Sequence, residues 1–269
     1  TRTLEEISKN YSEFYSGKIA NNIIKTVKES KNPGSLSLND LNNYTVKKKQ
    51  SLCHRLKNGY LVCGPNLPSS GTICVMQTLI LFENLYLEKL KKNTYKRDLN
   101  EILEILNFIY FQRDLTLGDA EYEKINVKLL LDENFLKKEF NLFKKSTIKQ
   151  SVRNFDEIFN STTHSSLIDK YKNVLSVTSS IESSFGSRLF VNGFFLNNQL
   201  TDFSFKSKDI NGKILPNRPQ GGKKPLSSMA PLIVFDENND FFLTIGSPGG
   251  KAIISYVSRV LIDILYLGL

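Results

Sequence analysis

The spacing of the apolar residues changes near residue 162 of this 269-residue chain. Before that point they recur every three or four positions, as in Ile73–Leu90 and in 95–113, and this spacing predicts amphipathic helices. After it they alternate with polar residues in short runs, which predicts β-hairpins. An apolar run from Ala252 onward predicts a further helix. Helices, then hairpins, then a helix indicate an α+β fold built in layers.

Short local signals predict where these elements turn. Asn58-Gly59 between two extended runs is the strongest hairpin signal in the chain. A second hairpin is predicted to turn at Glu237–Asp240, and a third joins "THSSLID" to "VLSVTSSI". The run "RLFVNGFFL" is expected to continue the strand pattern. Further helices are predicted over 3–31, as two helices broken near Gly17, after the turn in "NPGSLSLNDLNNY", and over 132–145.

Composition argues against two classes of protein. The net charge is +9, but the lysines lie in pairs and triplets on unrelated segments, which is typical of a solvated surface. A nucleic-acid-binding module, the competing class, would need a continuous basic face. The most apolar segments, Ile73–Leu87 and Val257–Leu269, are interrupted by polar residues, so no membrane span is expected.

The cysteines and histidines offer little material for a metal site. Cys53, Cys63 and Cys74 lack metal-type spacing, and their odd number leaves at least one unpaired. His54 and His164 are the two histidines of the chain. We therefore expect neither a metal nor another cofactor.

Paired glycines in "IGSPGGKAII" stand between an expected strand and an expected helix. Gly249 and Gly250 could present free backbone N–H groups at a helix N-terminus, which suits an oxyanion. A tight strand-to-helix turn would use the same residues, so the motif leaves both interpretations open.

Two other motifs carry polar side chains suited to an amino acid. Ser227 and Ser228 in "PLSSMAP" lie between prolines and could bind a carboxylate or a carbonyl oxygen. Gln199 and Asp202 in "FLNNQLTDFS" offer an amide and a carboxylate suited to an amine. Taken singly, each is also compatible with an ordinary polar loop.

The stretch "NSTTHSSLID", Asn160–Asp169, raises the possibility of a threonine nucleophile. The chain shows no arrangement of serine, histidine and aspartate that would supply a base. A threonine freed at its own amine could use that amine instead, because an α-amino group has a pKa close to neutrality. Such chemistry requires the chain to be cut before the threonine.

Five motifs occur together, in this order: "TTHSSLID", "VTSSIESSFGSRL", "FLNNQLTDFS", "PLSSMAP" and "GSPGG". With "FYSGKIA", "LSLNDLNNY", "PSSG" and "QRDLTLGD" earlier in the chain, they resemble the γ-glutamyltransferase (γ-glutamyltranspeptidase) family. The resemblance covers nearly the whole chain.

That resemblance implies an N-terminal-nucleophile (Ntn) hydrolase fold, a four-layer αββα sandwich. It implies a division into 1–161, the helix-rich end of a large subunit with a connector at 146–161, and 162–269, the start of a catalytic small subunit. Because the family's subunits extend further in both directions, the sandwich is expected to be incomplete at both ends.

The resemblance also implies an enzyme that cuts itself between Ser161 and Thr162. Thr162 would then attack the γ-carbonyl of glutathione or another γ-glutamyl compound, with Gly249 and Gly250 forming the oxyanion hole. Water or an amino-acid or peptide amine would resolve the γ-glutamyl enzyme. Ser180 matches a threonine hydroxyl that supports the nucleophile in the family.

The same resemblance assigns five residues to substrate binding. Glu182 would line the pocket for the substrate amine, and Gln199 with Asp202 would hold the α-amino group. Ser227 and Ser228 would touch the α-carboxylate and the scissile region. The two subunits would stay together after cleavage.

In the family the enzyme is usually exported, so a periplasmic or secreted location is expected. The alternative is an inactive or truncated remnant of the family with a structural or assembly role only.

Overall fold

The computed structural model describes residues 2–92, 94–95, 98–146 and 160–268. Backbone contacts divide the chain into two compact units. The smaller, which we call the helical unit, comprises Thr1–Lys48 and Ser180–Gln199. The larger, the sheet unit, comprises Lys49–Ser179 and Leu200–Leu269. The expected connector at 146–161 lies largely outside the described residues.

The helical unit is built on three helices: α1 (Arg2–Lys9), α2 (Lys18–Lys28) and α3 (Leu38–Asn42). α3 begins with a capping box, in which Ser37 and Asp40 each bond the other's backbone N–H, as "LSLND" predicts. Ile19 and Ile23 of α2 pack against Val191 to form a small core.

Val191 belongs to a short hairpin in this unit, formed by β5 (Phe190–Val191) and β6 (Phe194–Phe195). The sequence predicted a longer strand here. The strands are only two residues long because Asn192 and Gly193 both adopt positive φ, of 50° and 87°, which turns the chain sharply.

The sheet unit contains a four-stranded antiparallel sheet in the order β1-β2-β7-β8. Its strands form the two hairpins predicted at Asn58-Gly59 and Glu237–Asp240. Their bounds are β1 (Leu52–Arg55), β2 (Leu61–Gly64), β7 (Leu232–Phe235) and β8 (Phe241–Ile245). The first hairpin places Cys53 opposite Cys63, and the two form a disulfide with Cα atoms 4.1 Å apart.

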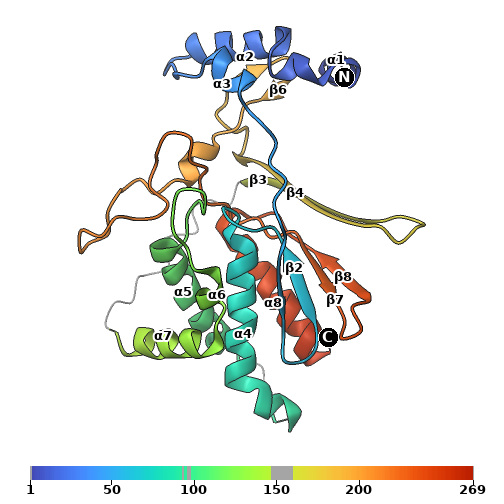
Figure 1. Ribbon diagram of the computed structural model, residues 1–269, viewed down its shortest axis with the longest axis vertical. Helices are drawn as coiled ribbons and strands as arrows, with labels where there is room; N and C mark the ends of the chain where they lie inside the picture. Colours follow the sequence, from blue (N-terminus) through green and yellow to red (C-terminus); the bar gives the residue numbers. More distant parts are fainter. Residues whose placement is uncertain (1, 93, 96–97, 147–159, 269) are drawn as a thin grey trace. The chain divides into compact units, whose positions relative to one another are not determined.

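Two helices, α4 (Ser70–Lys91) and α8 (Ile253–Leu267), pack on one face of this sheet. Three more, α5 (Leu99–Thr116), α6 (Val127–Leu130) and α7 (Glu133–Lys145), pack against α4. α4 lies between α5 and α8 and contacts both (Figure 1). The sequence predicted these helices except α6, whose four residues are too few to show a period.

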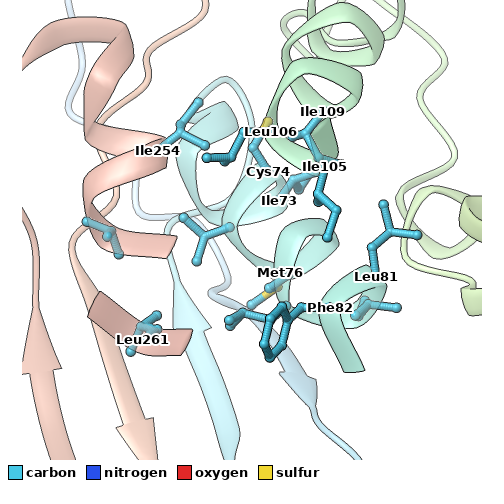
Figure 2. Packing of buried hydrophobic residues seen from close by; sticks show 14 of the residues in the cluster. Ile73, Cys74, Met76, Leu81, Phe82, Ile105, Leu106, Ile109, Ile254 and Leu261 are labelled. Atoms are coloured by element: carbon cyan, nitrogen blue, oxygen red, sulfur yellow. The ribbon is translucent and has the colours of Figure 1, made fainter. Parts of the chain in front are cut away.

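The main hydrophobic core forms where α4, α5 and α8 meet. Figure 2 shows Met76 and Phe82 of α4, Ile105 of α5 and Leu261 of α8 converging there. Cys74 lies in the same core, and burial raises the pKa of its thiol to about 12. This cysteine is therefore a packed apolar residue rather than a reactive one.

A third hairpin contacts the opposite side of the sheet at a few points, and the rest of it projects away from the sheet (Figure 1). It consists of β3 (Asn160–Ile168) and β4 (Val174–Ser183), whose last residues belong to the helical unit. Leu232 and Val234 of β7 face the helices, whereas Thr244, paired with Ile233, faces the other way. Thr244 Oγ1 lies 3.4 Å from Ser166 Oγ of β3. Helices packed on an antiparallel sheet, with a further hairpin beside it, agree with the predicted α+β class.

Within the described parts of the chain, no helix combines the length and apolar character needed to cross a membrane.

Candidate active site

Thr162 lies near the start of β3 and is 8% exposed. His164, two residues further along, is on the same face of the strand, because side chains alternate. The His164 ring fills the space beside Gly246, where an added Cβ would lie 2.2 Å from Nδ1. Gly246 directly follows β8 and precedes the glycine pair by three residues. Thr162 therefore lies on the face of β3 that contacts the start of the glycine turn.

His164 links β3 to its paired strand β4 through a neutral hydrogen bond and makes a second one within β3. Its Nδ1 lies 2.8 Å from Thr178 Oγ1 of β4, and its Nε2 lies 3.0 Å from Ser166 Oγ. Partial burial lowers the pKa of His164. An uncharged imidazole between two hydroxyls fixes the strand without offering a base aimed at Thr162.

The glycine turn has a backbone that suits glycine alone. Gly249 has a φ of 130° and Gly250 a φ of 53°, both in the region that side chains disfavour. A Cβ on Gly249 would lie 2.8 Å from the Tyr256 ring. Neither glycine N–H donates a hydrogen bond to another described residue. Two N–H groups at the start of a helical segment can therefore receive an anion.

Tyr110 of α5 fixes this turn through a hydrogen bond to its backbone. Its hydroxyl donates to the Lys251 carbonyl at 2.6 Å, directly after the glycine pair. Burial raises the pKa of Tyr110, so the hydroxyl keeps its proton and remains a donor.

The serine pair is attached to the beginning of α4. The Ser227 N–H donates to Pro68 O at 3.0 Å, and Ser227 O accepts from both the N–H and the hydroxyl of Ser70, at 2.7 and 2.8 Å. A Cβ on Gly71 would lie 2.5 Å from the Ser228 carbonyl oxygen, so only glycine permits this approach. The motifs "PSSG" and "PLSSMAP" are thus joined directly.

Arg113 of α5 lies beneath the serine pair and is only 4% exposed. Its Nε donates to Ser70 Oγ at 2.8 Å and its Nη2 donates to Ser228 Oγ at 3.1 Å. Its Nη1 pairs with Asp114 at 2.8 Å. Since Arg113 and Tyr110 are three residues apart on one face of α5, a single helix holds both the serine pair and the glycine turn.

Asn217 joins the Asp202 loop to the serine loop. Its Nδ2 donates to Asp202 O at 2.7 Å, while its Oδ1 accepts from Leu226 N–H, next to Ser227, at 2.9 Å. Asn217 is 5% exposed, so both bonds are shielded from water. Asp202, Ser227 and Ser228 are therefore members of one connected network.

A buried ion pair supports the same loop. The Lys223 ammonium, whose side chain is 0% exposed, lies 2.6 Å from Glu123, and Arg218 lies 2.7 Å from the same carboxylate oxygen. Burial alone would raise the pKa of Glu123, but the hydrogen bonds and charges of Lys223 and Arg218 outweigh it and lower the pKa.

Three predicted site residues lie in the helical unit: Ser180, Glu182 and Gln199. Glu182 has a φ of 74°, its N–H donates to Ser180 Oγ at 2.9 Å, and its carboxylate accepts from Ser183 and Asn198. These contacts hold the segment after β4 in a tight turn.

Sequence reasoning did not single out Tyr110, Arg113 or Asn217. Arg113 carried a usable signal, because it continues the stripe formed by Ile102, Leu106 and Ile109 on the buried face of α5. A charged residue in that stripe must be buried and paired.

The comparisons with known proteins agree with this architecture. The family model described as Gamma-glutamyltranspeptidase matches residues 1–269. The chain is 30% identical to the glutathione hydrolase proenzyme of Bacillus subtilis (strain 168), over 95% of this chain and 45% of the relative. It is 31% identical to that of Escherichia coli (strain K12), over 100% of this chain and 47% of the relative.

The fold also matches a solved structure. The cephalosporin acylase from Bacillus halodurans superposes with a TM-score of 0.78 at 18% identity, over 100% of this chain and 47% of that one. This likeness confirms the predicted Ntn-hydrolase type of fold. The chain spans about half the length of the curated relatives it matches. Its match to the family model along its whole length, and its identity with these relatives, place the chain in the gamma-glutamyltranspeptidase family.

Proposed function

We propose that the protein hydrolyses and transfers the γ-glutamyl group of glutathione and related γ-glutamyl amides, with Thr162 as its nucleophile. The observation that carries the proposal is the placement of Thr162. It is buried on the face of β3 that contacts Gly246, at the start of the segment containing Gly249 and Gly250. Acyl transfer needs a nucleophile and N–H donors for the oxyanion, and we propose that these two segments supply them.

The first step in this proposal is cleavage of the chain before Thr162. Thr162 Oγ attacks the Ser161 carbonyl, the peptide becomes an ester as the C–N bond breaks, and water hydrolyses the ester. The products are a carboxylate at Ser161 and a free α-amine at Thr162. The resulting pieces, 1–161 and 162–269 within this chain, are the proposed large-subunit and small-subunit parts and stay associated.

The freed amine then acts as the base. With a pKa close to neutrality it accepts the Thr162 hydroxyl proton as Oγ attacks the γ-carbonyl of the substrate. The Gly249 and Gly250 N–H groups stabilise the oxyanion, and the amine returns the proton to the leaving amine. Water or an acceptor amine then attacks the γ-glutamyl ester and regenerates Thr162. Ser180 supports the nucleophile in this scheme.

The substrate would be held by its two charged α-groups. Asp202, together with Gln199 and Glu182, is assigned to the α-ammonium group, because opposite charges form strong hydrogen bonds. Ser227 and Ser228 are assigned to the α-carboxylate. The network through Asn217 supports this assignment, because it fixes the spacing between the Asp202 backbone and the serine loop.

A periplasmic or secreted location is part of the proposal. The Cys53–Cys63 disulfide supports it, since such bonds persist mainly in oxidising compartments.

The experiment that tests the proposal measures release of a chromogenic amine from a γ-glutamyl anilide by the protein with whatever flanking sequence its gene encodes. Thr162→Ala is expected to abolish release, whereas Thr163→Ala, a change at the exposed neighbour, should retain most of it. Turnover by Thr162→Ala at the wild-type rate would refute the assignment.

A further inference from the structure

We propose that Arg113 is a positioning residue that turns Ser228 into a hydrogen-bond donor for the α-carboxylate of the substrate. This inference rests on the proposed function and adds a residue that none of the sequence motifs assigned to the site.

The first argument is the direction of the hydrogen bonds. A guanidinium has five N–H donors and no acceptor, so the Ser228 hydroxyl must accept in its 3.1 Å bond with Arg113 Nη2. The single hydroxyl proton of Ser228 is then directed to another acceptor. A carboxylate oxygen accepts such a proton, whereas an ammonium group has no acceptor to offer.

The Ser70 hydroxyl likewise accepts from Arg113 and donates to another group. It accepts from Arg113 Nε at 2.8 Å and donates to the Ser227 carbonyl at 2.8 Å. Arg113 therefore orders two hydroxyls at once: through Ser70 it fixes the backbone of Ser227, and directly it fixes the side chain of Ser228.

The second argument is charge. Arg113 carries a permanent positive charge and its side chain is 5% exposed, so water screens it poorly. Asp114, its partner, is 56% exposed and therefore well solvated. The Arg113 charge is thus shielded least on the side of Ser228, where it favours an anion.

The third argument is the shape of the side chain. Nε and Nη2 lie on one edge of a planar fork and reach Ser70 and Ser228 simultaneously. A lysine ammonium is a point donor that cannot reproduce both directions with the same geometry. Arg113→Lys should therefore retain charge but lose part of the orientation.

The test compares two substrates in the protein with whatever flanking sequence its gene encodes. One is a γ-glutamyl anilide with a free α-carboxylate, and the other is the same anilide with that carboxylate converted to a methyl ester. We expect Arg113→Gln to raise KM for the free carboxylate by about 10-fold to 100-fold, as for loss of a charge-assisted hydrogen bond, with kcat within about threefold. For the ester, kcat/KM should change by less than about threefold, and Arg113→Lys should fall between Gln and wild type.

Two further variants separate this role from a merely structural one. Arg259→Gln removes an exposed arginine that pairs with Asp263 on α8 and should leave turnover of both substrates unaffected. In a Ser228→Ala background, Arg113→Gln should have little additional effect on KM, because its target is already absent. Equal losses of kcat/KM on both substrates in Arg113→Gln would overturn the inference. So would additive effects of Arg113→Gln and Ser228→Ala on KM.

The proposed function and this inference fail in different ways. Absence of wild-type turnover on every γ-glutamyl anilide overturns the function and the inference with it. Wild-type turnover combined with an Arg113→Gln variant that does not distinguish the two substrates overturns the inference alone.

Discussion

The serine loop and the nucleophile strand of the sheet unit are held in place by different kinds of interaction. The loop around Ser227 is fixed by buried charge, through Arg113 and the Lys223–Glu123 pair. On strand β3, His164 makes neutral bonds to two hydroxyls, that of Thr178 on the paired strand β4 and that of Ser166 on β3 itself. Buried charges without their partners are costly, whereas a neutral bond is worth about 1 kcal/mol.

This difference suggests that the two regions of the candidate site have different roles. α5 anchors both the serine loop, through Arg113, and the glycine turn, through Tyr110. Those parts would recognise charge on the substrate and on the oxyanion, so their geometry must be preset. β3 carries the bond that we propose is cut. After cleavage, Thr162 becomes an N-terminal residue, and its new α-amine must take up a different position. Weaker anchoring of β3 suits that change.

Among changes that test this contrast, the largest effect is expected for Gly249→Ala, on the side anchored by α5. The added Cβ meets a φ of 130° and the Tyr256 ring, so the turn must move and displace the N–H donors. Loss of an oxyanion donor lowers kcat by on the order of 100-fold to 1,000-fold, and we expect that range in steady-state kinetics. The control is Gly193→Ala, which has φ 87° but open space around it. Equal turnover by the two variants would contradict the role of the turn.

A smaller effect, on stability, is expected for Glu123→Gln. The change leaves the buried Lys223 ammonium without its counter-charge and should lower the free energy of unfolding by about 3 kcal/mol at pH 7. Urea denaturation measures the change, and Glu88→Gln, in an exposed pair with Lys91, should cost almost nothing.

The same carboxylate gives the wild type a pH dependence of known sign. Its pKa is lowered in the folded protein, so its stabilisation is complete above the ordinary value of 4.5 and is lost as the pH falls below that value. The difference in the free energy of unfolding between wild type and Glu123→Gln should therefore shrink as the pH is lowered below 4.5. A gap that widens on acidification would show that Glu123 is not held ionised by Lys223 and Arg218.

The smallest effect is expected for Ser166→Ala, on β3. The change removes one neutral partner of His164 and one contact with Thr244, and should cost less than about 1 kcal/mol in urea denaturation. A cost larger than that of Glu123→Gln would abolish the contrast between the loop and the strand.

Local chemistry made much of the fold predictable. Asn58-Gly59 set the first hairpin, and Ser37 with Asp40 set the start of α3. The same hairpin could have predicted the disulfide, because Cys53 and Cys63 lie at equal distances from Asn58 and are therefore opposite each other. The strands of the β5–β6 hairpin were predicted too long, since an alternating pattern does not show where positive φ angles end a strand.

The contacts between distant segments could not be predicted in the same way. Asn217 joins two loops, but an asparagine in a loop is compatible with many local turns. Tyr110 reads as an ordinary member of the apolar face of α5, and nothing local shows that its hydroxyl meets Lys251. Arg113 is the exception, because its position within the buried stripe already demands a polar partner.

The most direct test of the central role proposed for Thr162 is mass spectrometry of the purified protein during prolonged incubation, with N-terminal sequencing of any product. We expect wild type to yield a fragment that begins at Thr162, and Thr162→Ala to remain a single chain of constant mass. Wild-type protein that stays intact throughout would contradict Thr162 as the nucleophile. So would a Thr162→Ala variant that is cut at the same bond.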